Sequence, residues 1–296
     1  MSDIKLFETV GSVKELLSSK VHLEKELQNL IEDNMELFFG VRFLKSEYAI
    51  TNGRMDSIGI DENNSPVIFE YKRSSNENVI NQGLFYLDWL LDHKGDFQML
   101  VIEKMGMDVA NAIDWSVPSV ICIASDFTKY DIHAVNQMQR NIKLVKYRKY
   151  SNGQILFEHL NTPIVKQVEQ DTVLGAEKKG SKTHQEKLKE APQNIRNIYY
   201  ELCNYIESLG DDISANQLKL YLAYKTTQNL ACIEIYKKHV TVYLKLSPDL
   251  VDLEAGFSKD MRGIGHYGTG DLQLTLKTVE DFNKAKALID RAYNEA

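Results

Sequence analysis

Two acidic residues and a lysine occur where two neighbouring strands are expected to meet. Asp56 lies in "GRMDSIGID", and Glu70 and Lys72 end the apolar run "VIFEYK". Residues i and i+2 of a strand point to the same face, so Glu70 and Lys72 lie side by side. The segment "ENNS" indicates a turn between the two runs. An antiparallel pairing across that turn would bring Asp56 beside Glu70.

This combination of residue types has a defined chemistry. Two carboxylates at one point hold a hard divalent cation such as Mg²⁺, which keeps several waters and takes only one or two protein carboxylates. A lysine beside the cation can orient the attacking water, help to deprotonate it and stabilise developing charge on a phosphate. The pattern therefore indicates phosphodiester hydrolysis.

The elements around these residues follow an α/β pattern. Apolar residues at helical spacing predict a helix within residues 21–39. Strands are predicted at residues 41–50, 54–62, 67–72, 96–104 and 118–125, an amphipathic helix at 77–93, and a closing hairpin from 141–150 and 153–160. The run "VICIA" is apolar on both faces, as in a sheet covered by helices on both sides. These elements predict an α/β or α+β domain with a mixed sheet.

The constellation D-x(13)-E-x-K resembles the PD-(D/E)xK nuclease superfamily. The surrounding text, "GRMDSIGID...VIFEYKR...NQGLFYLDWL", is similar to its NucS and restriction-endonuclease-like branch. Met55 stands where the name of the motif has Pro. The resemblance covers residues 20 to 160 approximately and implies a restriction-endonuclease-like α-β-β-β-α-β core with a mixed sheet flanked by helices.

The resemblance also implies roles for individual residues. Asp56 and Glu70 would be ligands of Mg²⁺ or Mn²⁺, and Lys72 would be the catalytic lysine. The main-chain carbonyl of Tyr71 would be a further metal ligand. Arg73, directly after the motif, is a candidate phosphate contact.

The same resemblance implies that two neighbouring helices contribute residues to the site. Members of the superfamily often supply a glutamate from the first helix; the candidates are Glu24, Glu26 and Glu32, and Glu24 is favoured because of its place beside the apolar stripe. A glutamine and a tyrosine accompany the motif on the next helix. Here they would be Gln82, as a catalytic residue, and Tyr86, as a nucleic-acid contact; at i and i+4 they share one helix face.

Each of these residues also has a simpler interpretation. Glu70 and Lys72 would be an exposed pair at a strand end, which adds little stability. Gln82 and Arg73 would be ordinary surface residues, and Tyr86 would pack in the core. The apolar strand before Glu70, the Gly-Arg turn before Asp56 and the helix that follows favour the active-site interpretation.

The second half begins after a charged stretch at residues 166–191, which predicts a solvated linker or the charged start of a helix. We expect two independently folding domains, residues 1–165 and 192–296. A helix is predicted at residues 191–210, strands within 218–226, 230–247 and 270–278, and a final helix from 279 with Thr278 as its N-cap. This is a small α+β domain.

The text "SLGDDI", "YLAYK" and "DMRGIGHYGTGDLQL" resembles a family of C-terminal domains of unassigned function labelled "predicted transport protein". "GIGHYG" matches the letters of a dinucleotide fingerprint, but a strand follows it where that fingerprint opens a helix, so we reject this interpretation. The glycines indicate a tight loop with positive φ. Arg262, His266 and Tyr267 on this loop are candidates for phosphate or base contacts, with a purely structural turn as the alternative.

Composition restricts the class of protein. The chain has 296 residues and a formal net charge of −7, which argues against a broad basic surface but leaves room for a local basic groove. The sequence contains no run of about 18 apolar residues, so no membrane span is expected. The N-terminal segment lacks the apolar region of a signal peptide. Three scattered cysteines, Cys122, Cys203 and Cys232, indicate reduced thiols in a cytoplasmic protein.

Two classes of function follow from the sequence. The first is a metal-dependent nuclease that cleaves nucleic acid, DNA rather than RNA, in which the second domain selects the target or a partner. Many nucleases of this kind cut both strands as dimers, so a homodimer is a candidate assembly. The second is a non-catalytic binding scaffold that retains the nuclease fold. The three intact motif residues favour the nuclease.

Overall fold

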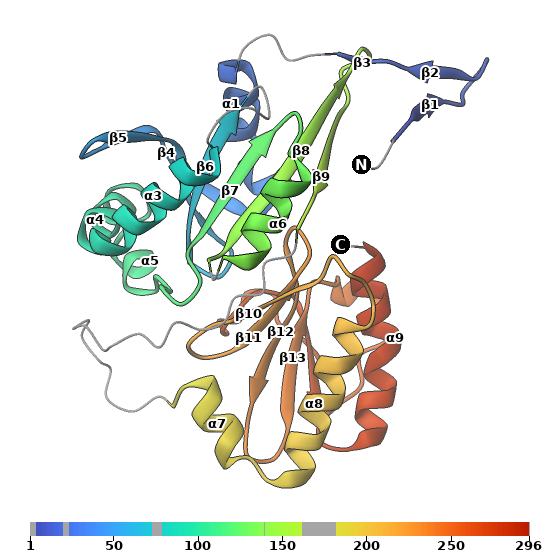
Figure 1. Cartoon of the computed structure of the whole chain (residues 1–296). Coiled ribbons are helices and arrows are strands. Elements are labelled where there is room, and N and C mark those ends of the chain that lie inside the picture. Colours follow the sequence, from blue (N-terminus) through green and yellow to red (C-terminus); the bar gives the residue numbers. More distant parts are fainter. Residues whose placement is uncertain (1–3, 20–23, 73–78, 139, 162–181, 296) are drawn as a thin grey trace.

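The structure, a computed structural model, describes residues 4–19, 24–72, 79–138, 140–161 and 182–295. Each half of the chain contains one main sheet with helices packed on it (Figure 1). The first half has a mixed sheet flanked by helices, and the second half has a separate antiparallel sheet. The expected fold class, a mixed-sheet α/β domain followed by a smaller α+β domain, is confirmed.

The first sheet carries the motif residues on adjacent strands. Its strand order is β3 (Ser18–Ser19), β8 (Ile142–Tyr150), β7 (Ser119–Ala124), β6 (Pro66–Lys72), β5 (Gly53–Asp61) and β4 (Val41–Ile50), with β9 (Ile155–His159) paired to β8. Strands β4, β5 and β6 are antiparallel, whereas β6, β7 and β8 are parallel. The register places Ser57 opposite Phe69. Asp56 is the residue before Ser57 and Glu70 is the residue after Phe69, so the two acidic residues lie next to each other across the two strands. This agrees with the pairing expected from the turn at residues 62–65.

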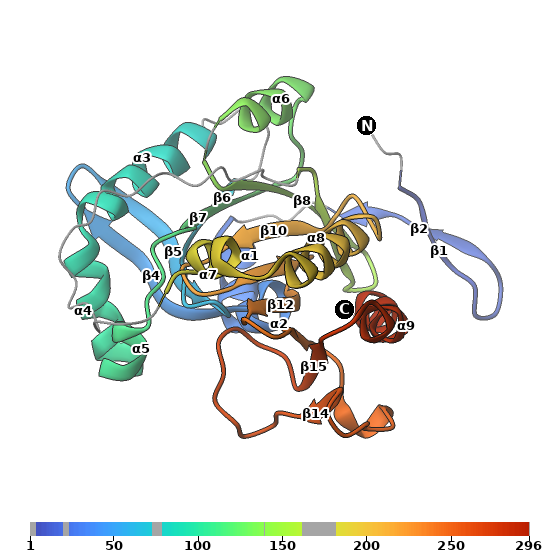
Figure 2. The ribbon, with the colours of Figure 1, turned by 90° about the horizontal axis from the view of Figure 1, so that it is seen from below.

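Helices cover both faces of this sheet. They are α1 (Glu24–Asp33), α2 (Met35–Phe39), α3 (Val79–Asp92), α4 (Lys94–Met105), α5 (Met107–Asn111) and α6 (Lys129–Gln137). Figure 2 shows α3 and α6 on one side of the sheet and α1 and α2 on the other. The first core contains Leu87 and Ile68, and the second contains Ile31 and Phe69. Helix α3 lies close on β7: a Cβ added at Gly83 would stand 2.7 Å from Val120 Cγ1.

The sequence interpretation was wrong about one element of this half. Residues 96–104 were expected to be a strand but belong to helix α4. Phe97, Leu100 and Val101 are buried there at i, i+3 and i+4, which is the spacing of a helix face. A short apolar run does not by itself distinguish a buried strand from a helix.

Three further elements were not predicted. Helix α6 begins with a capping box formed by Thr128 and Asp131. Near the N-terminus, β1 (Leu6–Glu8) and β2 (Lys14–Leu16) form a two-stranded hairpin that projects from the body of the first half (Figure 1). Arg148 Nη1 donates a hydrogen bond to the main-chain oxygen of Ile4 at 2.9 Å and so ties the start of this segment to β8.

The second sheet is antiparallel throughout. Its order is β10 (Ser214–Gln217), β11 (Leu222–Lys225), β12 (Asn229–Ile235), β13 (Val240–Leu244), β15 (Leu272–Leu276) and β14 (Ser258–Asp260), and a short 3₁₀ helix spans Pro248–Leu250. Helices α8 (Gln193–Glu207) and α9 (Val279–Glu295) bury Leu202 and Ile289 against this sheet. The expected N-cap of the last helix is confirmed, since Asp281 N–H donates to Thr278 Oγ1 at 3.1 Å.

The boundary between the halves differs from the expected linker at its C-terminal end. Residues 162–181 lie outside the described residues. Helix α7 (His184–Glu190) follows, starts with a capping box formed by Thr183 and Glu186, and buries His184. The charged start of a helix, one of the two interpretations of residues 166–191, therefore applies to this last part.

A polar interface joins the two halves. The side chain of Asn63, in the turn between β5 and β6, exchanges hydrogen bonds with Asn229 on β12 at 3.1 and 2.8 Å, and Tyr221 Oη donates to Asn63 Oδ1 at 3.0 Å. Asp61 lies 3.5 Å from Lys225, and both are nearly fully buried. These buried contacts couple the two halves, and the expectation that each half folds independently stays a prediction.

Candidate active site

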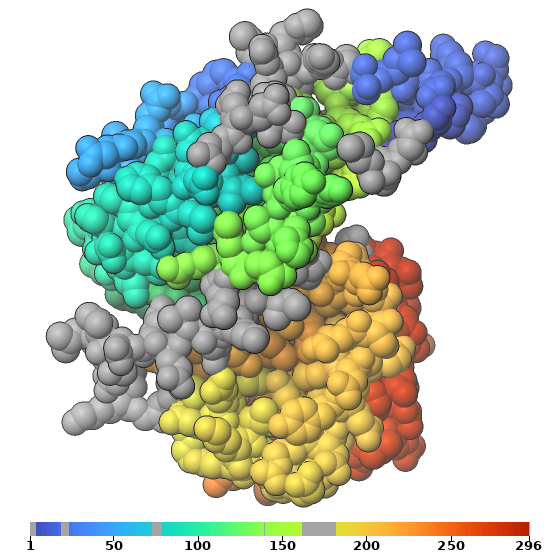
Figure 3. Space-filling view, in the orientation of Figure 1, coloured from blue at the N-terminus to red at the C-terminus, as the bar shows by residue number. Residues whose placement is uncertain are grey.

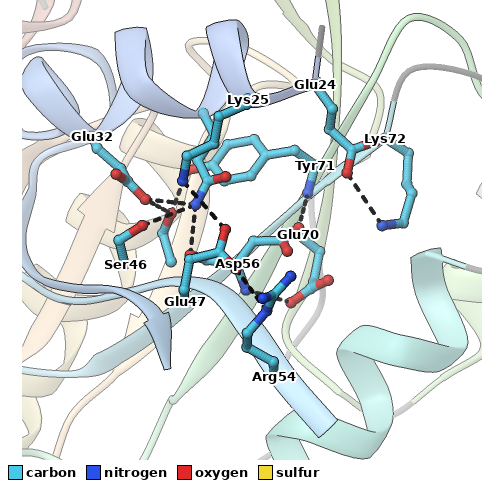
Figure 4. Close-up of polar contacts among 12 residues, drawn as sticks. Glu24, Lys25, Glu32, Ser46, Glu47, Arg54, Asp56, Glu70, Tyr71 and Lys72 are labelled. Atoms are coloured by element: carbon cyan, nitrogen blue, oxygen red, sulfur yellow. Dashed lines mark hydrogen bonds and ion pairs between the residues drawn. The ribbon is translucent and has the colours of Figure 1, made fainter. Parts of the chain in front are cut away.

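Asp56 and Glu70 are linked through the main chain of the two strands that carry them. The N–H of Asp56 donates to Glu70 Oε1 at 3.2 Å, and the N–H of Tyr71 donates to Asp56 Oδ2 at 3.0 Å (Figure 4). Each carboxylate thus accepts a hydrogen bond from the main chain of the strand that carries the other carboxylate. The sequence predicted this juxtaposition from the antiparallel turn.

The two carboxyl groups are withdrawn from water. Glu70 is only 1% exposed. Burial, together with the neighbouring Asp56 carboxylate, raises the pKa of Glu70 to about 9, against the opposing effects of the Asp56 N–H and Lys72. Burial also raises the pKa of Asp56, although the Tyr71 N–H and Lys72 oppose this. Without a cation the pair therefore retains a proton at neutral pH, because two buried like charges are costly.

Lys72 lies at the end of β6, beside the first turn of α1. Its Nζ is 3.7 Å from Glu24 Oε1, and its side chain is 13% exposed. Lys72 lowers the pKa of both Asp56 and Glu70, although burial raises each of them more. The separation from Glu24 is that of an ion pair rather than a short hydrogen bond. The lysine is thus held near the carboxylates by a glutamate of the first helix.

The three glutamates proposed from the first helix occupy different places. Glu24 reaches Lys72, as described above, while Glu26 pairs with Lys149 on β8. Glu32 Oε1 accepts a hydrogen bond from Ser57 Oγ at 2.6 Å, on the strand of Asp56. Of the three, Glu24 is the one that the structure brings to Lys72.

A polar network behind Asp56 was not predicted. Gln28 Nε2 donates to the main-chain oxygen of Asp56 at 2.8 Å and to Glu32 Oε1 at 2.8 Å. Tyr71 Oη donates to Ser57 Oγ at 3.1 Å, and Ser57 donates on to Glu32. Gln28 is 4% exposed. The sequence indicates that Gln28 lies beside the apolar stripe of an amphipathic helix. It does not indicate that Gln28 contacts Asp56 on a strand.

A third carboxylate lies beside the pair. Glu47, on β4, binds Arg54 Nε at 2.6 Å and Lys25 Nζ at 3.2 Å (Figure 4). Burial raises its pKa, but hydrogen bonds from Lys25 and Gln28 outweigh this and the net shift is downward. Its φ of 54° is unusual for a residue other than glycine. Sequence reasoning missed Glu47 and its two basic partners.

The donor set fits a hard divalent cation. In the described part of the chain no group of three or more His, Cys, Asp or Glu side chains is placed to hold a metal ion. Asp56 and Glu70 bring two carboxylates together, and Mg²⁺ commonly takes one or two protein carboxylates while it keeps several waters. A bound cation would also offset the negative charge of the two buried carboxylates and so would replace the proton that they otherwise retain. The metal role of the Tyr71 carbonyl stays a prediction.

The residues expected from the helix after the motif lie on α3. Tyr86 is 7% exposed, and a Cβ added at Gly53 would stand 2.8 Å from Tyr86 Cε1. Burial raises the pKa of Tyr86, and Glu70 adds to this, so the phenol lies at the buried edge of the site. A surface contact between Tyr86 and nucleic acid is therefore not supported. Gln82 is exposed one turn earlier, and Arg73 lies outside the described residues.

The glycine-rich loop of the second half is a structural turn with engaged side chains. Gly263 and Gly268 have φ values of 72° and 77°, as expected. The guanidinium of Arg262 forms ion pairs with Asp249 and Asp260, each at 2.7 Å, so its predicted phosphate contact would compete with two carboxylates. The ring of His266 stacks on Tyr243 with centroids 4.1 Å apart.

Tyr267, the third residue predicted on this loop, is 48% exposed. Tyr267 is therefore accessible to a ligand; Arg262 is also exposed, but it is engaged by Asp249 and Asp260. The nucleic-acid role predicted for Tyr267 and His266 stays a prediction.

Comparison with known proteins supports the nuclease class for the first half. Residues 23–110, which include every motif residue from Glu24 to Tyr86, match the family described as endonuclease NucS C-terminal domain. Residues 185–296 match a domain of unknown function, DUF5655. The label "predicted transport protein" expected for the second half is thus corrected. None of the described helices is long and apolar enough to cross a membrane.

The chain has a relative that it matches over nearly the whole length of both proteins. An uncharacterized protein of Haemophilus influenzae is 31% identical in an alignment of 298 positions that covers 96% of this chain and 97% of the relative. The chain therefore belongs to the same family as this Haemophilus influenzae protein, in which the two domains occur together.

Two solved structures are similar to part of the chain. A repair endonuclease from Pyrococcus abyssi shares 19% identity at a TM-score of 0.29, over 44% of this chain and 50% of the other. A structure of an EndoMS–dsDNA2 complex shares 20% identity at a TM-score of 0.26, over 43% and 47%. The chain thus matches about half the length of these endonucleases.

Proposed function

We propose that this protein is a nuclease that hydrolyses phosphodiester bonds in DNA with Mg²⁺ or Mn²⁺. The observation that carries the proposal is the buried pair of Asp56 and Glu70, fixed through each other's strands with Lys72 at the strand end. The match of residues 23–110 to an endonuclease domain family supports it. DNA, rather than RNA, is proposed from the resemblance to the NucS branch.

Asp56 and Glu70 would hold the cation, and the strands would fix its position. Hydrogen bonds from the main-chain N–H groups of Asp56 and Tyr71 orient one oxygen of each carboxylate. Gln28 and Glu32 hold β5 from behind, so the ligands are oriented before the ion arrives. A bound divalent cation supplies positive charge and polarises the phosphate that it contacts.

Lys72 would contribute the chemistry that belongs to the chain itself. As an ammonium it stabilises negative charge that develops on the phosphate, and it orients the attacking water. Glu24 would hold the lysine near the site, and the 3.7 Å separation leaves Nζ able to turn towards a substrate. Gln82, exposed on the same face of α3 as Tyr86, would contact the bound strand.

A cleavage assay tests this proposal. The parent protein should cut DNA with Mg²⁺ or Mn²⁺ and not with EDTA, whereas Asp56→Asn should be inactive. Glu103→Gln is a matched control, since Glu103 is a highly exposed acid of α4. Equal cleavage by the parent and Asp56→Asn would show that any activity comes from elsewhere. Parallel duplex DNA, single-stranded DNA and RNA substrates establish the substrate class.

The proposal includes two features of assembly. The second domain, residues 185–296, would select the target or a partner. Because one such site cuts one strand, cleavage of both strands would use two copies of the chain, and a homodimer is proposed. Light scattering of the protein alone and with duplex DNA measures this directly.

A further inference from the structure

A cleft lies between the two halves, away from the motif residues. It has a volume of about 510 Å³. One wall comes from α6, β8 and β9 of the first half, and the other comes from the loop before β10 and the β11–β12 turn of the second half. Figure 3 shows these two parts of the molecule, green and orange, facing each other. The cleft is within the range of ligand-binding sites for small molecules.

Lys143 gives the first wall of the cleft a basic group. Its side chain lines the cleft, is half-buried, and takes part in no ion pair with any residue that the structure describes. The neighbouring Lys225 has a partner of its own, Asp61, at 3.5 Å. Burial and Lys225 lower the pKa of Lys143 to about 7, and the opposing effects of Asp61 and Glu62 are smaller. An anion would supply the missing counter-charge.

Neutral donors stand beside this lysine. His159, an exposed residue, lines the same wall, and partial desolvation, together with Lys143 and Lys225, lowers its pKa to about 4. The imidazole is therefore neutral at pH 7 and offers one N–H. Thr226 and Thr227 line the opposite wall with hydroxyl groups.

Other polar groups of the cleft are already engaged. Asn161 accepts a hydrogen bond from the N–H of Leu144 at 2.7 Å and donates to the oxygen of Ile142 at 2.8 Å. Asp211 and Asp212 are the two acidic residues that line the cleft, and Asp212 accepts a hydrogen bond from Tyr293 at 2.9 Å. These carboxylates disfavour an extended polyanion and would restrict an anion to the Lys143 end of the cleft.

We propose that this cleft binds a small phosphate-bearing molecule, with Lys143 and His159 as donors to the phosphate and Thr226 and Thr227 closing over it. Phosphate suits this arrangement because a compact anion with several acceptor oxygens satisfies an ammonium, an imidazole N–H and hydroxyls together. Its binding would join the two halves across their interface. The site is independent of the proposed nuclease chemistry, whose residues lie on β5 and β6.

Calorimetric titration with inorganic phosphate, pyrophosphate and adenosine monophosphate tests the proposal. The titrations are made in EDTA at constant ionic strength. At least one of the three should bind, and Lys143→Met should weaken it about tenfold or more, as expected for a lost charge-assisted hydrogen bond. Lys149→Met is the matched control on the same strand, because Lys149 is paired with Glu26. Lys143→Arg should retain most of the affinity.

Two results would overturn the inference. One is a parent protein that binds none of the three probes, and the other is a Lys143→Met variant that folds and binds them as the parent does. A DNA duplex without terminal phosphates distinguishes the two sources of phosphate. If Lys143→Met weakens the duplex and leaves the small anions unchanged, the lysine contacts nucleic acid and the small-molecule site is wrong. Glu70→Gln should bind the small anions normally, so failure here is distinct from failure of the nuclease proposal.

Discussion

The N–H of Asp56 donates to Glu70 Oε1 at 3.2 Å, so the main chain of one candidate ligand holds the side chain of the other. Both side chains are drawn out of water by this geometry, and their pKa values rise together because of burial. The arrangement is costly for a protein that has no use for it. Each prediction below follows from that cost or from how it is relieved.

Replacing Glu70 by glutamine should stabilise the metal-free protein at pH 8. Glutamine has the shape of the protonated acid and carries no charge, so the folded variant does not have to take up the proton that Glu70 binds on folding at this pH. The melting temperature of Glu70→Gln in EDTA should therefore exceed that of the parent. A melting temperature several degrees below the parent would mean that Glu70 is a structural residue whose charge the fold requires.

Stability of the parent in EDTA should fall as the pH rises. Glu70 has a pKa of about 9 when folded, above the ordinary value of 4.5. The folded state thus holds a proton that the unfolded chain releases between these values. Its contribution is complete below about pH 4.5 and is lost as the pH rises through about 9, with a slope of up to about 1.4 kcal/mol per pH unit. Denaturant titrations from pH 5 to 9 should show this slope in the parent and a smaller one in Glu70→Gln.

Divalent cations should reverse the order of stability. Mg²⁺ or Mn²⁺ bound to the folded state adds RT ln(1 + [L]/Kd), about 2.7 kcal/mol at a hundredfold excess over Kd. The parent should gain this amount, and Asp56→Asn and Glu70→Gln should gain little. Ca²⁺ and Na⁺ at equal ionic strength are the controls for general salt effects. An equal gain in all three proteins would place the ion elsewhere.

Removal of the Ser57 hydroxyl should lower both the stability of the protein and its affinity for the metal. Ser57→Ala leaves Glu32 without the 2.6 Å hydrogen bond and Tyr71 without its acceptor. The expected loss is about 1 to 3 kcal/mol of unfolding free energy, with weaker metal binding. Ser208→Ala, at an exposed helix end, is the control for a surface serine. Unchanged stability and metal affinity in Ser57→Ala would show that the network does not support the ligands.

The interface between the halves should contribute to stability. Asn63→Ala removes the hydrogen-bond partners of Asn229 and Tyr221 in a buried place, at a cost of about 2 to 3 kcal/mol. Both halves should then lose stability together in hydrogen exchange. Asn204→Ala, on the exposed face of α8, should be nearly neutral. Loss of protection confined to one half would support two independent domains, as first expected from the sequence.

Much of the fold around the site could be predicted because its signals are local. The strands that carry Asp56 and Glu70 lie on either side of a short turn, and their antiparallel pairing follows from that turn. Residues 96–104 were assigned wrongly because a short apolar run fits a strand and a helix alike. Periodicity alone did not show that Phe97 and Leu100 face the same core.

The rest of the site depends on contacts between distant segments. Gln28 reaches Asp56 from another element, and Glu47 lies beside it only because β4 pairs with β5. The ion pair between Arg262 and Asp249 could not be predicted either, because Asp249 comes from a different loop. A sequence pattern indicates which side chains are suited to a ligand, but it does not show which of them the protein has already paired.

The central claim is that Asp56 and Glu70 hold a metal ion and that Lys72 supplies a separate part of the chemistry. The most direct test measures Mn²⁺ binding by calorimetry and DNA cleavage in the same preparation of Lys72→Ala. Loss of a positive charge beside the ion should leave Mn²⁺ affinity equal to that of the parent or higher, while cleavage falls about a hundredfold or more. A Lys72→Ala protein that cleaves DNA as fast as the parent, or a parent that binds no Mn²⁺, would contradict the account.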